Sequence, residues 1–584
     1  MKKHVATLMS DFYKQAHAEQ YNENLVLLVD YLTPRTSRLQ GVDYLISFGH
    51  QGFAKEFLIE YFNETFFNID IEDAIKEHKR AIRYCMTKEH VDYEKIHKLH
   101  KLGYLPLEIR VIPEGTKVPI HVPMLEIRNT HPDFIWVVGF IESVMSCELW
   151  YPMTVANQAY HYREIANEWY GKTVENGLNV AKHAISEFGF RGGKGREAGI
   201  LASAAFLTSF DKTATIPALL YLEDYYNCNI EDGNVGGGML STEHSVMCSN
   251  ASIDGDEAIF YRKLFVQLYP TGNLSVVCDS YDYWNIVENV ICKKYKTEIL
   301  NRDGCIYVRG DSGKPADIIC GTLKASDYMV IPGLTEDGIK KYFRKYAEEH
   351  YPWDGCDETW YKVRIGDKLY TVTAYHGYID EDNDGSGYYT AEVDDIIFTS
   401  EDITPEMKGT VELLYDNFGG NVNNLGYKVL DSHVRAIYGD SITPDLAKEI
   451  YSRLADKGFA ACNVALGAGS FSMQCTREDK ELKPFTRDTY GIAIKATYGE
   501  LKDGTPIEIF KNPKTDSGIK KSQKGMCFVH KNESGQIVYE DGYNSKNIPS
   551  EENGNLFVTI FKDGKVMNEQ SIHDIRNRLH NNNF

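Results

Sequence analysis

Acidic side chains follow several short apolar runs of this chain, each at the point where its run stops. Asp279, Asp311 and Asp440 all stand in this position, and Arg191 and Arg309 end runs of the same kind. Carboxylates are the hard oxygen ligands that hold magnesium together with substrate phosphates, and guanidinium groups pair bidentately with phosphate. The residue types therefore predict chemistry on a phosphorylated substrate with a magnesium ion.

Two glycine-containing segments strengthen the case for phosphate. Gly439-Asp440-Ser and Gly467-Ala-Gly469-Ser470 lie just past apolar runs and before helical sequence. Exposed backbone N–H groups and the helix dipole favour a phosphate there, and a phosphorylated sugar would fit such a rim. Taken singly the signals are weak, because Asp-Ser-Gly is a common turn and a lone arginine at a strand end usually forms a surface ion pair. Their recurrence at strand ends carries the prediction.

The elements that must position these side chains are the apolar runs themselves. They cover residues 185–191, 213–217, 239–245, 274–280, 305–313, 434–440 and 463–469. Continuous β-branched and apolar runs separated by enough chain for a helix indicate parallel strands of an α/β barrel, whose reactive face lies where the strands end. We therefore expect one shared mouth that carries Arg191, His244, Asp279, Arg309, Asp311 and Asp440.

The rest of the chain divides around this barrel. Residues 1–155 predict a mixed α+β region that ends in an aromatic-rich helix over 132–155, typical of a core or a subunit interface. The barrel takes 156–320 and 405–500, and the alternating pattern of 321–404 predicts an inserted β-rich module. Residues 501–584 are expected to complete the β domain and the phosphate site.

One segment of the insert resembles a metal loop without matching it. Asp380, Asp382, Asp384 and Gly385 are spaced as in a calcium loop, but Ala391 stands where a bidentate glutamate is required. We interpret the segment as the polar tip of a hairpin.

Composition excludes several classes of function. The formal charge of -21 argues against nucleic acid or an anionic membrane as partner, and no stretch reads as long or apolar enough to span a bilayer. Twelve cysteines without a Cys-x-x-Cys pair, and an N-terminus without an apolar signal core, predict reduced thiols in the cytoplasm.

An ordered set of motifs resembles the nicotinamide phosphoribosyltransferase family. The matching segments are Asp11-Phe-Tyr-Lys-Gln-Ala-His, Glu187-Phe-Gly-Phe-Arg-Gly, Thr242-Glu-His-Ser, Val276-Val-Cys-Asp-Ser-Tyr-Asp, Arg309-Gly-Asp-Ser-Gly, Tyr438-Gly-Asp and Thr486-Arg-Asp. The similarity runs from about residue 7 to the C-terminus and is interrupted chiefly by the insert. It implies an open, TIM-like α/β barrel beside a mixed β domain.

The resemblance also implies roles for individual residues. The pyridine ring would lie between Phe188 and Tyr13 of the partner subunit, so the protein would be a homodimer. Arg191 would contact the carboxamide or a phosphate, and Asp279 and Asp311 would position the ribose hydroxyls, magnesium and the pyridine. The phosphates would be surrounded by Arg35, Arg309, Arg487, Lys495 and Lys511.

The implied reaction needs no protein nucleophile. The nitrogen of nicotinamide attacks C1 of 5-phosphoribosyl 1-pyrophosphate, and magnesium and arginines stabilise the leaving pyrophosphate. In the family a histidine placed like His244 is phosphorylated by ATP, and Glu243 would orient its imidazole. The alternative for His244 is an imidazole that is hydrogen-bonded within the barrel rim.

Two departures from the family pattern leave the substrates open. Ala214 stands where nicotinamide-selective members carry an aspartate that accepts from the amide, so nicotinate remains a second acceptor. Phe471 replaces a glycine of the phosphate loop, and extra residues follow at 475–483. Some virus-encoded relatives use ADP-ribose pyrophosphate as donor and make NAD directly, and the enlarged phosphate end together with the β-rich insert would suit this second donor. Alternatively, both insertions are peripheral additions to the surface.

Two interpretations from other classes complete the alternatives. A glycosidase would need a close pair of acids as acid and nucleophile, and the excess of arginines argues against it. A regulator that binds pyridine nucleotide without catalysis would release no pyrophosphate.

Overall fold

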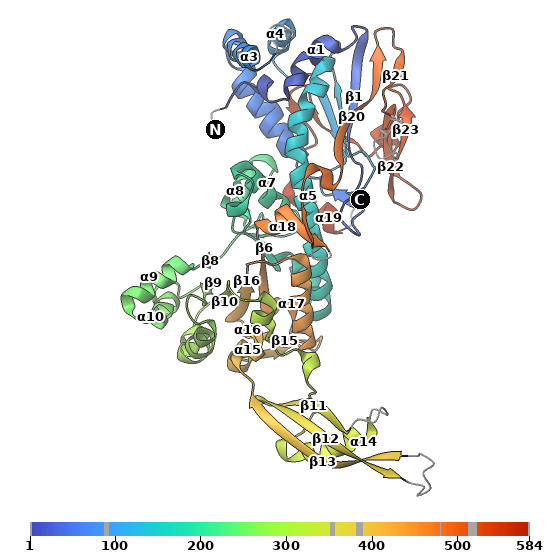
Figure 1. Ribbon diagram of the computed structural model, residues 1–584. Coiled ribbons are helices and arrows are strands. Elements are labelled where there is room, and N and C mark those ends of the chain that lie inside the picture. The colour runs from blue at the N-terminus through green and yellow to red at the C-terminus, as the bar shows by residue number, and fades with distance from the viewer. Residues whose placement is uncertain are drawn as a thin grey trace. The chain divides into compact units, whose positions relative to one another are not determined.

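The computed structural model describes residues 3–86, 93–350, 357–380, 389–478, 481–511 and 523–581. Contacts divide the chain into two units. Unit 1 comprises Met1–Glu164, Ile185–Gly238 and Ala468–Phe584, and unit 2 comprises Ile165–Ala184 and Met239–Gly467. Figure 1 traces the chain through its elements, and each unit is described here by itself.

Short parallel strands form where the apolar runs lie. In the described part of the chain these are β6 (Ile185–Glu187), β7 (Lys212–Thr213), β8 (Leu240–Ser241), β9 (Leu274–Val277), β10 (Ile306–Gly310), β16 (Val434–Tyr438) and β17 (Val464–Ala468). Each overlaps one predicted run, and the hydrogen-bonded order is β7-β6-β17-β16-β10-β9-β8. The expected parallel α/β barrel class is confirmed.

Helices connect these strands along the chain, and four of the described ones, α10 (Glu257–Arg262), α11 (Tyr283–Asn285), α15 (Pro405–Lys408) and α17 (Pro444–Asp456), begin with a side-chain cap. In α17 the Thr443 side chain accepts from the backbone of Leu446, and proline takes the first helical position. The other connecting helices are α7 (Arg196–Phe206), α8 (Ile216–Tyr225), α9 (His244–Asp254), α12 (Lys296–Leu300), α13 (Pro315–Cys320), α16 (Thr410–Phe418) and α18 (Ser470–Gln474).

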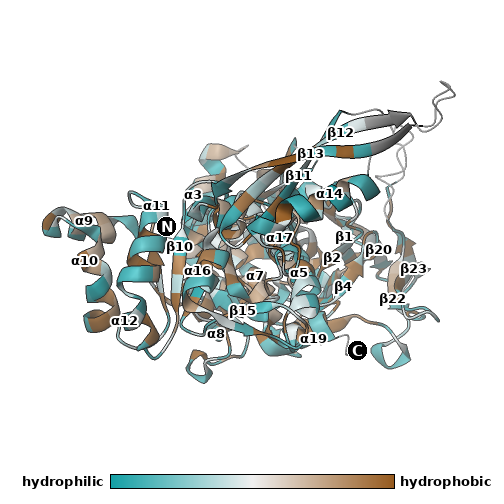
Figure 2. Ribbon diagram, turned by 90° about the horizontal axis from the view of Figure 1, so that it is seen from below, coloured by the Kyte–Doolittle hydropathy of each residue, from teal (hydrophilic) through white to brown (hydrophobic). Residues whose placement is uncertain are grey.

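The inserted segment of unit 2 folds around a core of its own. Strands β11 (Glu358–Ile365), β12 (Lys368–Asp380) and β13 (Tyr389–Asp402) form an antiparallel sheet packed against α14 (Ile339–Glu349). Hydrophobic and hydrophilic residues alternate along these strands in Figure 2, as a sheet with one buried face requires. Most of the calcium-like segment, 381–388, lies outside the described residues.

The two ends of the insert meet at a pair of glycines. Gly321 has φ +84°, and a Cβ there would lie 2.2 Å from the carbonyl oxygen of Met407. Gly409 has φ +83°, and its Cβ would lie 2.1 Å from the nitrogen of Gly321. Only residues without a side chain permit this approach, so the backbone crossing fixes where the insert leaves and rejoins unit 2.

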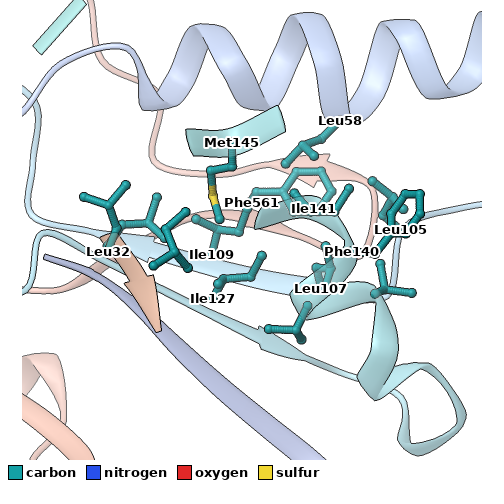
Figure 3. Packing of buried hydrophobic residues seen from close by; sticks show 14 of the residues in the cluster. Leu32, Leu58, Leu105, Leu107, Ile109, Ile127, Phe140, Ile141, Met145 and Phe561 are labelled. Atoms are coloured by element: carbon teal, nitrogen blue, oxygen red, sulfur yellow. The ribbon is translucent and has the colours of Figure 1, made fainter. Parts of the chain in front are cut away.

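An antiparallel sheet organises unit 1. Its order in the described residues is β21 (Pro506–Glu508), β20 (Ile492–Leu501), β1 (Leu25–Pro34), β5 (Leu125–Asn129), β3 (Leu107–Val111), β24 (Val558–Lys562) and β25 (Lys565–Val566). Four of these strands come from the C-terminal part of the chain, and β20 lies here although residues 405–500 were assigned to the barrel. Figure 3 shows Leu32, Ile109, Ile127 and Phe561 of this sheet packed with Phe140 of the long helix.

The long helix α5 (Ile135–Thr173) extends well past the predicted end at residue 155. Residues 132–173 are long and apolar enough, by length and composition, to cross a membrane, so the expectation that no stretch qualifies was wrong. Because 67% of the most apolar window is buried inside the protein, the segment is a core helix. Further helices of unit 1 are α1 (His17–Gln20), α2 (His50–Phe53), α3 (Ile71–Cys85), α4 (Tyr93–Leu102) and α19 (Ile572–Asn581).

Candidate active site

A buried carboxylate links the ends of two adjacent strands of unit 2. Asp279 follows β9, and its Oδ2 accepts hydrogen bonds from the backbone N–H of Asp311, 2.9 Å away, and from Ser312 Oγ, 2.6 Å away. Only 4% of the Asp279 side chain is exposed, and its Oδ1 has no hydrogen-bond partner among the described residues. Because such an oxygen is costly to leave unpaired, Oδ1 is the place to expect a ligand.

His244 points its imidazole at the same carboxylates. It begins α9, and Nε2 lies 3.5 Å from Asp279 Oδ1 and 3.8 Å from Asp311 Oδ2. Nδ1 lies 3.2 Å from the hydroxyl of Ser280, whereas the Glu243 carboxylate accepts from the hydroxyl of Ser245. Glu243 was predicted to orient the imidazole, but in the structure Ser280 lies at Nδ1, and the Glu243 carboxylate faces Ser245 in the first turn of α9.

Arg309 is engaged by the protein on three sides. Its Nε lies 3.2 Å from Asp311 Oδ1, and its terminal nitrogens donate to Ser241 Oγ at 2.6 Å and to the carbonyl of Thr242 at 2.8 Å. Thr242 Oγ1 in turn accepts from the backbone of Val277 at 2.9 Å. Arg309 therefore ties β8 to β10, and only part of its donor fork is left for a phosphate.

The electrostatics of this group favour a shared cation. Burial raises the pKa of Asp311 above its ordinary value; Arg309 lowers this pKa, Asp279 and Asp440 raise it, and His244 lowers it, with a net rise. The same acids, together with burial, hold the pKa of the Tyr438 hydroxyl above its usual range. A partly buried carboxylate with other acids close by is suited to a metal ion or to a developing positive charge.

Unit 1 carries a second group at the end of β6. Phe188 donates its N–H to the carbonyl of Ala468 at 3.0 Å, and a Cβ on Gly469 would lie 3.4 Å from the Phe188 ring. A Cβ on Gly192 would lie 2.1 Å from Ser470 Oγ. The segment that contains Arg191 therefore packs closely against the phosphate loop, and the absence of a side chain at Gly192 permits this contact. The structure thus brings Phe188, Gly469 and Ser470 together, with Arg191 exposed beside them.

Sequence reasoning missed the acid that organises this second group. Glu187 is fully buried and accepts from the Gly189 N–H at 3.1 Å, from Ser203 Oγ at 2.8 Å and from Thr213 Oγ1. Its position at the head of the matched motif was the available signal, but nothing in the sequence separated it from a surface acid. Because Thr213 and Thr215 are buried, the Ala214 side chain between them is exposed.

The remaining predicted residues contact other parts of the protein. Tyr13 is 59% exposed beside His17, and Lys495 lies 3.4 Å from Glu142. Arg35 and Arg487 come from neighbouring segments, because the backbone N–H groups of Thr36 and Arg38 donate to the carbonyls of Tyr490 and Thr489.

Three further segments complete the placement. Gly467 lies within β17 near its end, and Lys511 is exposed. Gly439 and Asp440 follow β16 and precede Ser441, whose φ of 60° turns the chain toward α17.

Comparison with known proteins places this geometry in a family. The model of the "Nicotinate phosphoribosyltransferase (NAPRTase) family" matches residues 386–547. The chain is 33% identical over 580 residues to a protein of Acinetobacter baylyi named "Nicotinamide phosphoribosyltransferase", covering 97% of this chain and 96% of that one. It is 25% identical over 574 residues to the protein of the same name from Xanthomonas campestris, covering 97% of each. Among solved structures, the nicotinate-nucleotide pyrophosphorylase of Pyrococcus furiosus is similar at a TM-score of 0.49 and 11% identity, covering 98% of this chain and 94% of that one.

We expect Asp311→Asn to raise the melting temperature at pH 7. The folded-state pKa of Asp311 lies above the ordinary value of 3.8, so ionisation destabilises the folded state increasingly as pH rises from 3.8 through that raised pKa. The asparagine removes this cost, and its advantage should shrink as the pH falls toward about 4. Thermal melts between these pH values check it.

Asp503→Asn serves as the control with the opposite sign. Hydrogen bonds from Thr505 hold the pKa of Asp503 below its ordinary value, so its replacement should not raise the melting temperature at pH 7. An Asp311→Asn protein that melts at or below the wild-type temperature at pH 7 would contradict the assignment.

Proposed function

We propose that this chain, which belongs to the nicotinamide phosphoribosyltransferase family, transfers the phosphoribosyl group of 5-phosphoribosyl 1-pyrophosphate to nicotinamide. The products are NMN and pyrophosphate, and the protein is a phosphoribosyltransferase of NAD biosynthesis. The observation that carries the proposal is the Asp279 carboxylate: two hydrogen bonds hold its Oδ2 at the strand ends, while its Oδ1 accepts no hydrogen bond among the described residues and faces His244.

The reaction exchanges one bond for another at C1 of the ribose. The pyridine nitrogen donates its lone pair to C1 while the bond from C1 to the pyrophosphate oxygen breaks, and the leaving group keeps that electron pair. Positive character on the sugar is stabilised by the nearby carboxylates of Asp279 and Asp311, which are fixed before the substrate arrives. Positioning of this kind supplies much of the rate, and no proton has to move to a protein group.

The donor set fits a magnesium ion that is shared with the substrate. Asp279 and Asp311 offer two hard oxygen ligands, and the described residues contain no group of three His, Cys, Asp or Glu side chains that could hold a metal. Two carboxylates plus substrate phosphates is the arrangement in which proteins commonly bind Mg²⁺. Bound there, magnesium would neutralise charge on the pyrophosphate. Asp279 and Asp311 would hold it, and Arg309 would keep Asp311 oriented.

We include the phosphorylation of His244 by ATP in the proposal. A ring nitrogen would attack the γ-phosphorus of ATP, the bond to the bridging oxygen would break, and ADP would leave. The imidazole is 45% exposed and is therefore reachable, while Ser280 at Nδ1 fixes the ring orientation.

One assay tests the proposed function. Purified protein with nicotinamide, 5-phosphoribosyl 1-pyrophosphate and Mg²⁺ should yield NMN and pyrophosphate by mass spectrometry, and chelation of the metal should abolish turnover. Addition of ATP should raise product formation and give a phosphoramidate signal in 31P NMR that His244→Ala lacks.

The same assay contains the outcomes that would contradict it. If the protein forms only NAD, and only from ADP-ribose pyrophosphate, then that compound and not 5-phosphoribosyl 1-pyrophosphate is the donor. Binding of the substrates without release of pyrophosphate would indicate a non-catalytic protein. ATP-independent turnover at an unchanged rate in His244→Ala would remove the phosphohistidine.

The Ala214 side chain has no polar group that could distinguish nicotinamide from nicotinate. We propose nicotinamide as the preferred acceptor. The exposed side chain of Ala214 stands between the buried Thr213 and Thr215, so an aspartate there would project from the same place. A carboxylate at this position would accept from the amide of nicotinamide and repel the carboxylate of nicotinate.

We expect Ala214→Asp to raise the selectivity for nicotinamide over nicotinate about tenfold or more, since a hydrogen bond to a charged group contributes about 1.5–3 kcal/mol. The ratio of the two kcat/KM values measures it. Ala214→Asn is the matched control, because it accepts a hydrogen bond without repelling nicotinate. Equal selectivity in both variants and the wild type would show that residue 214 does not face the pyridine.

We propose a homodimer in which Tyr13 completes the partner's pyridine site. Phe12 and Tyr13 are 54% and 59% exposed, which is unusual for adjacent aromatic residues without a partner surface. In unit 2, α9 and α10 also expose Val246, Ile253 and Ile259, and hydrophobic stretches are visible along both helices in Figure 2.

Mixing two inactive variants tests the shared site. Tyr13→Ala and Asp311→Asn should each be nearly inactive alone. After denaturation and refolding together, half of the dimers would carry one intact site of two, so about a quarter of the wild-type activity should return. Mixed Tyr13→Ala and Tyr13→Ala/Asp311→Asn proteins form the control and should recover nothing. No recovery in the first mixture, despite dimers by light scattering, would place Tyr13 outside the partner's site.

A further inference from the structure

The residues that exceed the family pattern after the phosphate loop form a regular hairpin. Strands β18 (Cys475–Glu478) and β19 (Glu481–Pro484) pair antiparallel, with Arg477 opposite Leu482. The hairpin follows α18 directly, and α18 begins at Ser470 of the loop. Residues 475–478 and 481–484 of the added length are therefore paired strands attached to the phosphate end of unit 1.

Most charges of this hairpin are satisfied by its surroundings. Glu478 Oε1 accepts from the backbone N–H of Gln40 at 2.9 Å, and Lys483 lies 2.9 Å from Glu481. Arg477 is the exception, because the described residues give it no carboxylate within ion-pair distance. An exposed arginine without an acid partner is notable in a chain whose formal charge is -21.

Arg477 is nevertheless held in place. Its guanidinium carbon lies 5.8 Å from the ring centroid of Phe471, within the range of a cation–π contact. Phe471 immediately follows Ser470, and it is the residue that replaces a glycine of the family's loop. The aromatic ring thus gives the guanidinium a contact near the loop.

A second cation approaches the same spot from the arginine motif. Burial raises the pKa of the Cys475 thiol, and both Arg477 and Lys194 counteract that rise, so the two cations lie near the same sulfur. Lys194 Nζ donates to the carbonyl of Phe485 at 3.3 Å, and Gln474 Nε2 donates to the carbonyl of Gly192 at 2.6 Å. These contacts join the hairpin to the segment that follows Arg191 and create a positive field beside the loop.

We propose that Arg477, held on the ring of Phe471, is a further donor-binding residue whose guanidinium binds a phosphate oxygen of the pyrophosphorylated ribose at the Gly469-Ser470 loop. This assignment rests on the proposed function. It gives the hairpin a role in substrate binding, and it explains why an aromatic residue stands where a glycine would suffice. A planar guanidinium on a fixed platform is pre-organised for two parallel hydrogen bonds to phosphate.

Steady-state kinetics of hairpin variants test the assignment, with 5-phosphoribosyl 1-pyrophosphate as the donor. Arg477→Ala should raise the KM for this donor about tenfold, as expected for one lost charge-assisted contact. The KM for nicotinamide and kcat at saturating donor should stay within about twofold, because the contact stabilises ground state and transition state alike. Arg477→Lys should restore part of the affinity, and Phe471→Leu should give a smaller rise.

Lys483→Ala is the matched control on the same hairpin. It removes a cation that already pairs with Glu481, and it should leave the donor KM unchanged. An unchanged donor KM in Arg477→Ala would overturn the assignment. Equal losses of kcat in Arg477→Ala and Lys483→Ala would also overturn it, since they would indicate a purely structural hairpin.

Calorimetry separates this test from that of the proposed function. Titration of wild type and Arg477→Ala with 5-phosphoribosyl 1-pyrophosphate and Mg²⁺, without nicotinamide, should show about tenfold weaker binding in the variant. This difference without turnover in the wild type would support Arg477 while the proposed reaction fails. If the wild type binds no donor, both proposals fall.

Discussion

The rest of the candidate site depends on the hydrogen bonds that Asp279 accepts from the backbone of Asp311 and the hydroxyl of Ser312. These hydrogen bonds fix the segment after β9 relative to the segment after β10. The backbone pairing of the two strands would not by itself determine how these two segments lie. One oxygen of the carboxylate is consumed in this structural role, and the other faces His244. A single buried charge therefore aligns the strands and provides the reactive edge, so substitutions at residue 279 affect geometry and electrostatics together.

The barrel was predictable from the sequence because several of its strands are largely buried. β9 is buried at all four positions, and in the sequence such a strand appears as a continuous apolar run that stops at a charged residue. The polar contacts of the site could not be predicted from the sequence in the same way. Ser280 and Glu187 are ordinary residue types whose roles arise only when helix and strand ends converge. Arg309 shows the limit well: the resemblance assigns its guanidinium to the substrate phosphates, whereas Asp311, Ser241 and Thr242 already contact it.

Elements that depend on distant packing were the least predictable. α5 continues through Pro152 because surrounding structure buries it, although proline normally ends a helix at or before the preceding residue. β7 and β8 contain two residues each, too few to show a period, and each overlaps only the beginning of a longer predicted run. The extra residues after the phosphate loop were recognised as added length, but neither their pairing nor the contact of Arg477 with Phe471 follows from composition.

The glycine crossing at the base of the insert has an evolutionary consequence. The backbones of Gly321 and Gly409 are in contact, so the inserted segment leaves unit 2 and returns to it at one point. If the segment between them were deleted, a short peptide would be enough to join the two ends. The inserted segment also carries its own core of Ile339, Phe343, Val363 and Val372. Such a crossing lets a lineage acquire, exchange or discard a whole module in one genetic event while the strands that bear Asp279 and Asp311 keep their places.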